Sequence, residues 1–319
     1  MDISENHSIK IRKNMDRLQA MAVLLRTVDR GSFSAASREL GIPLPTVSRK
    51  VNELESHLGA KLLVRSTRKL ALTAAGQVYV AAARRILEQV DDAEREAAGE
   101  FTAPKGELCV TAPLSFGRIH VLPVVAEFLA TYPEIDVRLL LSDRNIHLLD
   151  ENLDMALRIG VLPDSSLVAT RVGFTRQIIC ASPALLARRG MPETPQHLAS
   201  LPLVSFDVLT AADSWNFRGP SGEAVSVQIR AKLVVSTADA AVCGAIAGVG
   251  LVRLFHYQCA DALADGSLQI VLPEFEPEPL PVHILHAPRG SLPFKTRAFI
   301  DFATTRLKRR MMVHDQSGS

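Results

Sequence analysis

Residues 33–76, FSAASRELGIPLPTVSRKVNELESHLGAKLLVRSTRKLALTAAG, decide the fold of the N-terminal part of this chain. FSAASREL has one apolar face and predicts a short helix, which Gly41 ends because glycine adopts the left-handed conformation at little cost. Pro45 suits the start of a second helix, where its missing N–H is not needed. The second helix carries an apolar stripe at helical spacing: Val47, Val51, Leu54 and Leu58. The stretch therefore predicts a helix-turn-helix.

The remaining positions of the second helix carry side chains suited to DNA. Hydroxyl, amide and guanidinium groups reach base edges and phosphates when a helix lies in the major groove. A helical hairpin with a solvated polar face would show the same pattern, so the residues that follow decide between the two. We expect DNA contacts from Pro45, Thr46, Ser48, Arg49 and Asn52.

A basic segment from Leu62 to Leu72 follows and predicts a wing, in which Arg65, Arg68 and Lys69 contact the phosphate backbone. Residues 1–72 contain 13 Lys and Arg against 7 Asp and Glu. Residues 73–105 contain 4 Lys and Arg against 6 Asp and Glu, and residues 106–319 contain 19 Lys and Arg against 21 Asp and Glu. Because positive charge is concentrated beside the helix-turn-helix, the segment favours DNA binding over a merely solvated surface.

These motifs resemble the LysR-type transcriptional regulators. The resemblance covers about Met15 to Leu307 and implies a winged helix-turn-helix, a dimerising linker helix and an effector domain. Its N-terminal motifs are Gly31-Ser32-Phe33, Ala35-Ala36, Thr46-Val47-Ser48-Arg49, Leu54-Glu55, Leu58-Gly59, Arg65-Ser66-Thr67-Arg68, Leu72-Thr73 and Ala75-Gly76.

One departure from that pattern lies just before the second helix. Many members have Ser-Gln there, whereas this chain has Pro43-Leu44. Leu44 cannot hydrogen-bond a base, although it can touch a thymine methyl, and neither residue supplies a side-chain oxygen for an N-cap. The preferred DNA sequence is therefore not transferable from members that carry Gln.

A long helix is expected from Thr73 to about Glu100. Its narrow apolar seam repeats at steps of three and four, so the helix either packs on its own domain or pairs with a second copy. The resemblance favours an antiparallel linker-helix pair that dimerises two DNA-binding heads. The seam consists of Ala75, Tyr79, Ala82, Ile86, Val90, Ala93 and Ala97.

Beyond Gly106 the pattern alternates between strands and helices and predicts parallel strands covered by helices. One longer strand is expected over Thr170–Cys180, and a final helix over Lys295–Arg306. The overall fold class is α/β with an N-terminal all-α-type winged helix-turn-helix. By resemblance, the effector domain has two Rossmann-like α/β lobes similar to those of periplasmic solute-binding proteins.

The chain is therefore expected to contain six segments. They are a disordered extension (1–14), the winged helix-turn-helix (15–72), the linker and dimerisation helix (73–103), effector lobe 1 (106–181 with 282–310), effector lobe 2 (182–281) and a tail (311–319).

An effector is expected in the cleft between the two lobes, where strands end and helix N-termini point inward. Ser115 and Phe116 open a helix after the first strand of lobe 1. Arg158 either pairs with a ligand carboxylate or holds neighbouring loops, and Thr237 either contacts the ligand or only caps a helix. The candidate ligand-binding residues are Ser115 and Phe116 and, by resemblance to the family, Arg158, Ser205, Thr237 and Gly248.

Other site chemistries have little support in the sequence. No GxSxG, paired-carboxylate motif or HExxH occurs, so neither a catalytic residue nor a metal ligand is expected. The four cysteines show no close pairing and are expected to be buried and reduced, with Cys243 the best candidate for a redox sensor. No cofactor is expected apart from an unidentified small-molecule effector.

Two alternatives compete with a regulator: a small-molecule-binding or enzymatic α/β protein with a degenerate DNA-binding head, and a solute-binding receptor. The second would need a secretion signal, and residues 1–14 lack an apolar centre. No uninterrupted apolar run reaches the roughly 18 residues of a membrane span. The expected partners are double-stranded DNA, further copies of the chain in a dimer or tetramer, the effector and RNA polymerase. The expected location is the bacterial cytoplasm, at the nucleoid.

Overall fold

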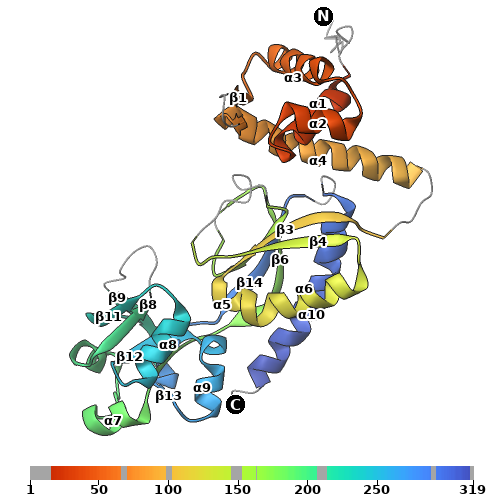
Figure 1. Ribbon diagram of the computed structural model, residues 1–319. Coiled ribbons are helices and arrows are strands. Elements are labelled where there is room, and N and C mark those ends of the chain that lie inside the picture. The colour runs from red at the N-terminus through yellow and green to blue at the C-terminus, as the bar shows by residue number, and fades with distance from the viewer. Residues whose placement is uncertain are drawn as a thin grey trace, which may run out of the picture. The chain divides into compact units, whose positions relative to one another are not determined.

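A computed structural model describes residues 16–65, 70–97, 103–144, 153–162, 164–206, 214–288 and 292–316. The chain divides into two compact units, Met1–Thr102 and Ala103–Ser319 (Figure 1). Each unit has its own buried apolar core. The two units are therefore described separately.

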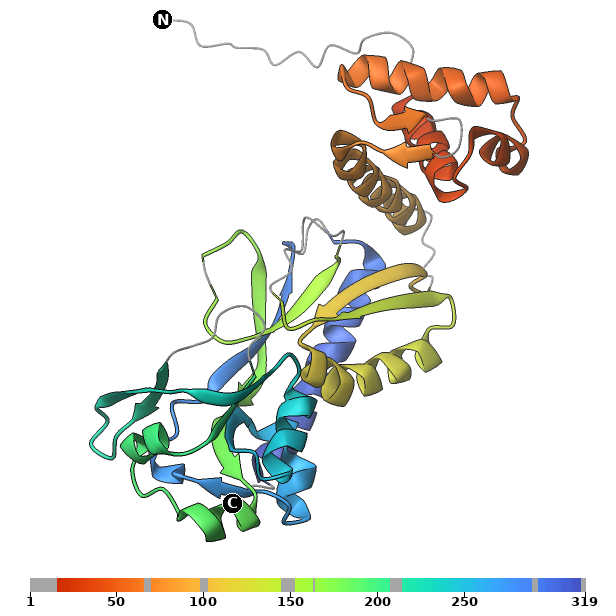
Figure 2. The same cartoon turned by 60° about the vertical axis from the view of Figure 1, so that its left-hand side comes forward.

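The N-terminal unit is a helix-turn-helix followed by a two-stranded antiparallel hairpin (Figure 2). Asp16 caps the first helix through the N–H of Gln19, and Ser32 caps the second through the N–H of Ala35. Gly41 ends the second helix with φ +65°, as its sequence position predicts. The elements are α1 (Arg17–Asp29), α2 (Phe33–Leu40), α3 (Leu44–Leu58), β1 (Leu63–Arg65), β2 (Leu70–Leu72) and α4 (Ala74–Ala97).

The core of this unit lies where α1, α3 and α4 meet. Val47, Val51 and Leu54 on α3 are fully buried, which confirms three positions of the predicted stripe, but the fourth, Leu58, is 39% exposed at the end of the helix. Thr73 Oγ1 accepts a hydrogen bond from the N–H of Gly76 at 2.9 Å, so α4 begins at the predicted cap. The winged helix-turn-helix predicted from the sequence is confirmed.

Gly76 sets how closely α4 approaches the start of the hairpin. A Cβ there would lie 2.0 Å from the carbonyl oxygen of Leu62, and backbone cannot move aside cheaply. Gly76→Ala is expected to destabilise the N-terminal unit by about 2–3 kcal/mol. Urea unfolding followed by far-UV circular dichroism should show an earlier transition. The fluorescence of Trp215, the only tryptophan and part of the other unit, should be unchanged.

Gln77→Ala is the matched control for that prediction, because Gln77 is an exposed neighbour on the same helix and lies outside the seam. Equal loss of stability in the Gly76 and Gln77 variants would contradict the close approach of α4 to Leu62.

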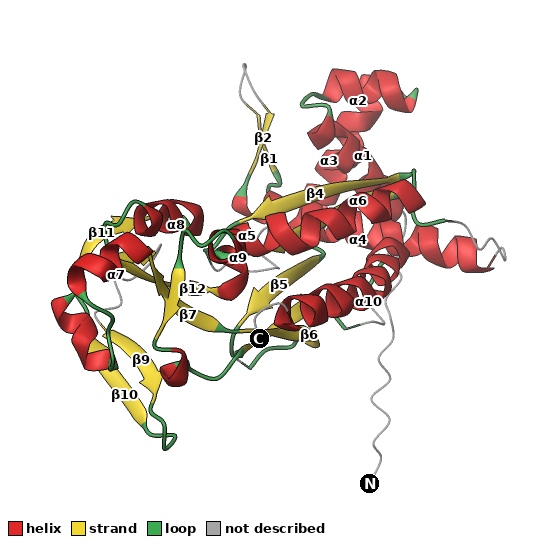
Figure 3. Ribbon diagram, turned by 90° about the horizontal axis from the view of Figure 1, so that it is seen from below, coloured by secondary structure: helices red, strands yellow, loops and turns green. Residues whose placement is uncertain are grey.

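The C-terminal unit contains two five-stranded sheets, which define its two lobes (Figure 3). The first sheet has the order β4-β3-β5-β14-β6. Its core includes Phe128 on α6 and Phe299 on α10, whose rings pack edge to face. The elements of this lobe are β3 (Gly106–Ala112), α5 (Leu114–Phe116), the π-helical η1 (Gly117–Val121), α6 (Leu122–Thr131), β4 (Ile135–Leu141), β5 (Met155–Ile159), β6 (Val168–Thr175), β14 (Leu280–His286) and α10 (Phe294–Gln316).

The second sheet has the order β11-β8-β12-β7-β13, and a separate hairpin of β9 and β10 lies against one face of it. Helix α8 packs on the other face. The elements of this lobe are β7 (Gln177–Ala181), α7 (Pro183–Arg189), η2 (Pro195–Ser200), β8 (Leu203–Phe206), β9 (Ser214–Arg218), β10 (Ala224–Gln228), β11 (Ala231–Val235), α8 (Ala238–Ile246), β12 (Leu251–Phe255), η3 (His256–Gln258), α9 (Ala260–Ala264), β13 (Gln269–Val271) and η4 (Pro273–Phe275).

The α/β class and the two lobes agree with the prediction, but three details were wrong. Both sheets are mixed rather than parallel, since β14 runs antiparallel to β5 and β6, and β7 antiparallel to β12 and β13. The single strand expected over Thr170–Cys180 is two strands in different sheets, with the change at Arg176. Residues 177–181 thus pair within lobe 2, and α10 continues through Gln316 into the expected tail.

The helix formed by α5, η1 and α6 is 18 residues long, with a mean hydropathy of 1.3. By length and composition alone it could span a membrane, which was not predicted from the sequence. The window contains Arg118 and Glu127, however, and 44% of it is buried inside the protein. Val124 and Phe128 lie in the core of the first lobe, so this is a core helix.

Candidate DNA interface and effector site

Helix α3 presents the predicted DNA-contacting side chains away from the apolar core. Pro45, Arg49 and Asn52 are exposed, and Thr46 and Ser48 are partly buried. The Arg49 side chain is 68% exposed and forms a long ion pair, at 4.0 Å, with Glu53 one turn later. Such a pair is weak and easily exchanged for a phosphate or a base. Helix α3 begins at Leu44 without a side-chain cap, as Pro43-Leu44 predicts.

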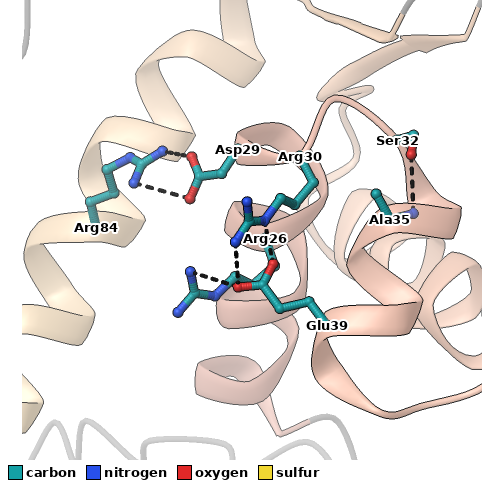
Figure 4. A network of polar contacts seen from close by, with 7 residues as sticks. All are labelled: Arg26, Asp29, Arg30, Ser32, Ala35, Glu39 and Arg84. Carbon is teal, nitrogen blue, oxygen red and sulfur yellow. Dashed lines mark hydrogen bonds and ion pairs between the residues drawn. The ribbon is translucent and has the colours of Figure 1, made fainter.

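Ion pairs between charged side chains link the end of α1 to α2 and to α4 (Figure 4). Arg30 donates two hydrogen bonds to Glu39 of α2, and Arg26 lies 3.4 Å from the same carboxylate. The hydrogen bond from Arg30 lowers the pKa of Glu39. Asp29 accepts from Arg84 of α4. The network links α1, α2 and α4 into one scaffold for α3.

Glu55 connects α3 to the hairpin. Its side chain is 3% exposed and accepts hydrogen bonds from the backbone N–H groups of Leu62 at 2.9 Å and Leu63 at 3.1 Å. Lys61 donates to the other oxygen at 2.7 Å. Burial tends to raise the pKa of Glu55, but these hydrogen bonds outweigh it and the pKa is lowered. The carboxylate thus orients the hairpin relative to α3.

The hairpin stands where the basic wing was expected. Arg65 ends β1, but its side chain is not among those that the structure describes, and Arg68 and Lys69 lie outside the described residues. Their contact with phosphates stays a prediction.

The predicted seam on α4 lies beside the stripe that packs on the helix-turn-helix. Val80 and Ala83 form that packed stripe and are 5% and 0% exposed. On the seam, Ala75, Ile86, Ala93 and Ala97 are exposed, and Tyr79, Ala82 and Val90 are partly buried. Val78 next to the seam is 74% exposed. Helix α4 therefore packs on its own domain through one stripe, against whose core Tyr79 of the seam also packs. Among the described residues the rest of the seam stays exposed or only partly buried.

In the C-terminal unit, Ser115 and Phe116 lie in the first turn of the long helix of lobe 1. Phe116 is fully buried, with its ring 5.5 Å from that of Tyr257 and 4.8 Å from that of His120. Ser115 is 1% exposed, and its Oγ has no hydrogen-bond partner among the described residues. A buried hydroxyl of this kind is a candidate donor to a bound molecule.

An ion pair joins the two lobes close to the start of the lobe 1 helix and of α8. Arg118, in the π-helical segment, pairs at 2.9 Å with Asp239 in the first turn of α8. Thr237 Oγ1 accepts from the N–H of Ala240 at 3.2 Å, so Thr237 caps α8, the structural alternative left open by the sequence.

The other candidates are more dispersed. Gly248 follows the C-terminal end of α8, whereas Thr237 precedes its N-terminal end, so the structure does not bring these two together. Gly248 instead has a left-handed backbone, φ +72°, near Ser182 and Arg188. Arg158 is partly buried on β5, which lowers its pKa, and donates to the carbonyl of Leu157 at 3.0 Å. Ser205 is partly buried on β8.

Arg253 on β12 is a candidate site residue that was not predicted from the sequence. Its guanidinium carbon lies 5.0 Å from the centroid of the Trp215 ring, and Nη1 donates to the carbonyl of Asn216 at 3.4 Å. The available signal was a single cation in the apolar run Leu251-Val252-Arg253-Leu254-Phe255.

The cysteines divide between core and surface. Cys180 and Cys259 are buried, and the hydrogen bond between them, together with burial, raises the pKa of Cys180. Burial raises the pKa of Cys109 to about 11. Thiols of raised pKa are poor nucleophiles. Cys243, the candidate sensor, is exposed on α8. Within the described ranges no group of three or more His, Cys, Asp or Glu side chains is arranged to hold a metal ion.

Helix α3, the hairpin and the two-lobed unit define a winged helix-turn-helix DNA-binding protein with an appended ligand-binding type of domain. A family model for bacterial regulatory helix-turn-helix proteins of the lysR family matches residues 18–77. A model for the LysR substrate binding domain matches residues 102–308. The chain belongs to the LysR family of bacterial transcriptional regulators, and is a regulator rather than an enzyme.

Similar proteins cover almost the whole chain. The probable HTH-type transcriptional regulator LtrA of Klebsiella pneumoniae is 34% identical over 292 residues, which are 91% of this chain and 94% of the relative. CrgA, a LysR-type transcriptional regulator from Neisseria meningitidis, has a solved structure that matches with a TM-score of 0.58 at 29% identity, over 93% of this chain and 99% of that one. Full-length LysG from Corynebacterium glutamicum, with bound effector Arg, has the same fold at 21% identity, with a TM-score of 0.63 over 92% and 98% of the two chains.

Proposed function

We propose that the protein is a homodimeric regulator that binds dyad-symmetric promoter sites and responds to a small-molecule effector in its C-terminal unit. The observation that carries the DNA-binding part is helix α3, whose Arg49 and Asn52 are exposed and whose Ser48 is partly buried beside the fully buried stripe. Ser48 and Arg49 read bases in the major groove, while Arg65, Arg68 and Lys69 of the wing anchor phosphates.

A two-fold dimer follows from the seam on α4. Pairing two copies along that seam presents two α3 helices to half-sites related by the same two-fold axis. Two dimers associate through the C-terminal units into a tetramer. The protein acts in the bacterial cytoplasm, at the nucleoid, where it contacts RNA polymerase.

The effector binds between the lobes of the C-terminal unit. The assignment is supported by the buried Oγ of Ser115, which has no hydrogen-bond partner among the described residues, and by the ion pair of Arg118 with Asp239 between the lobes. That LysG holds the effector Arg supports this assignment by analogy of fold. Binding shifts the relative orientation of the lobes and of the dimer, and this changes the spacing of the two α3 helices and the bend of the DNA.

Capture of genomic fragments with the full-length protein, followed by footprinting of the strongest site, tests the proposal. Protection of two half-sites about one helical turn apart, or a multiple of it, is the expected result. Uniform weak binding to all fragments, with no protected dyad, would overturn it.

Arg49→Ala is expected to relax sequence preference rather than to remove DNA binding. An arginine that bonds a base edge contributes about 1–3 kcal/mol of discrimination, roughly 5–150-fold, at its position. Competition footprinting on the captured site and on single-base variants measures this discrimination. The matched control is Arg85→Ala on the exposed surface of α4. An equal loss of affinity on every sequence would assign Arg49 to a phosphate instead.

A further inference from the structure

Arg253 lies in the middle of the second lobe, on β12, the central strand of its sheet. Its neighbours Val252 and Leu254 pack into the cluster beneath α8, whereas Leu251 packs with Trp215 on the opposite face. Because side chains alternate along a strand, Arg253 points to the same face as Leu251. Its guanidinium lies over the Trp215 ring, with its Cζ 5.0 Å from the ring centroid.

This cation has no counter-charge within the described part of the chain. Its contacts there are the Trp215 ring and the carbonyl of Asn216 at 3.4 Å. Other arginines nearby are matched: Arg218 on the neighbouring hairpin pairs with Glu278, and Arg176 lies 3.8 Å from Glu276. Arg253 therefore differs from its surroundings in lacking a carboxylate.

Burial lowers the pKa of Arg253 to about 10, which shows that its charged form is poorly solvated. A guanidinium carries five N–H donors in a planar fork, and one carbonyl and one ring satisfy only part of them. A desolvated cation is strongly stabilised by an anion that supplies the missing acceptors.

The surroundings of Arg253 also suit a bound molecule. Val204 on β8 and Val252 on β12 are register partners, and Ser205 and Arg253 are the next residues on these two strands. The hydroxyl and the guanidinium thus occupy neighbouring positions on one face. Two residues further, the ring of Phe255 stacks on that of Tyr257 at 5.8 Å and packs against the core of lobe 1. Arg253 therefore lies near the end of β12 that meets the other lobe.

We propose that Arg253, stacked on Trp215 and beside Ser205, binds the carboxylate of a small organic acid that acts as the effector. This rests on the proposed function, in which the C-terminal unit binds an effector, and it names the chemical class of that effector. A carboxylate presents two coplanar acceptors that match the guanidinium fork. The Trp215 ring is only 4% exposed and supports the guanidinium, whereas the partly buried Phe255 supplies apolar surface beside it.

The test uses the fluorescence of Trp215, since it is the only tryptophan of the chain and lies on Arg253. The full-length protein is titrated with acetate, benzoate and inorganic phosphate, and with acetamide and benzamide as neutral counterparts. A saturable change is expected with at least one carboxylate and with neither amide. Arg253→Gln should weaken that binding by about tenfold or more, since a charge-assisted hydrogen bond is lost.

Two variants complete the design. Arg218→Gln, an exposed arginine on the same hairpin as Trp215, is the matched control and should bind as the wild type does. Arg253→Lys keeps the charge without the planar fork and should bind with intermediate affinity. Circular dichroism of each variant checks that it is folded.

The proposal is overturned if no carboxylate changes the fluorescence up to about 10 mM, a concentration that covers even weak fragments. It is also overturned if Arg253→Gln binds as tightly as the wild type, and the carboxylate assignment fails if phosphate alone binds. Footprinting of the wild-type preparation separates these results from the proposed function. If the dyad-symmetric DNA site is protected but no anion changes the fluorescence, only the Arg253 site is rejected. If no dyad-symmetric site is protected, the proposed function itself is rejected.

Discussion

Ile86→Glu is expected to convert the protein to monomers and to lower its affinity for a dyad-symmetric DNA site by about 100-fold or more. Ile86 lies on the seam of α4 and is 38% exposed, and Val78, next to the seam, is 74% exposed. A two-fold interface along this seam brings each copy's residue 86 into or near apolar surface, where a carboxylate is strongly unfavourable. In a dimer, binding of one half-site raises the effective concentration of the second DNA-binding head at the other half-site. Loss of the dimer removes this gain, which is about 10²–10⁴ in affinity.

Sedimentation equilibrium measures the mass of the Ile86 variant, and a titration with one footprinted site measures its affinity. Gln77→Glu provides the control, because Gln77 is exposed on α4 and lies nine residues from Ile86, two and a half turns away on the opposite side of the helix. A dimeric Ile86→Glu protein with wild-type affinity would exclude α4 as the dimer interface.

The N-terminal unit was predictable because its signals are local. The stripe of Val47, Val51 and Leu54, the left-handed Gly41 and the cap at Thr73 each depend on residues within a few positions, and each lies in the structure as expected. What the sequence did not show is the role of Glu55. It lies on the buried side of α3 and bonds backbone groups seven and eight residues away, which no helical periodicity indicates.

The C-terminal unit was predicted less fully because its sheets depend on non-local pairing. A run of strand-forming residues from Thr170 to Cys180 gives no sign that the chain changes sheets at Arg176. The antiparallel strands β7 and β14 lie where the chain passes between lobes, and a helix–strand alternation cannot reveal their direction. Thr237 and Gly248 were placed on one cleft by the family resemblance, whereas the structure has them at opposite ends of α8.

Arg253 was missed for a related reason. In the sequence it is one arginine among apolar residues, and such residues usually find a carboxylate elsewhere in the fold. Only the structure shows that its neighbours are Trp215 and a backbone carbonyl. Arg158, which the sequence favoured, donates to the carbonyl of Leu157, the preceding residue of its own strand, and this contact does not decide between its two predicted roles.

Glu55→Ala is expected to destabilise the N-terminal unit by about 3–4 kcal/mol. The substitution leaves the N–H groups of Leu62 and Leu63 without their acceptor in a buried position, and each unsatisfied group costs about 1–3 kcal/mol. Loss of the partner of Lys61 adds little, because the Lys61 side chain is 75% exposed. Far-UV circular dichroism during urea unfolding should show an early transition, with the Trp215 transition of the other unit unchanged. Glu53→Gln is the matched control, since the Glu53 side chain is 46% exposed on the same helix.

The same carboxylate makes the stability of this unit depend on pH in a fixed direction. The folded pKa of Glu55 is lowered below its ordinary value of 4.5, so the folded state favours the ionised form. Its contribution is therefore complete above about pH 4.5 and is lost as the pH falls through the folded pKa. Glu55→Gln keeps one acceptor oxygen but cannot titrate, so the difference in unfolding free energy between wild type and variant should shrink as the pH falls from 6 to 3. A difference that stays constant over this range would show that the charge of Glu55 does not hold the hairpin to α3.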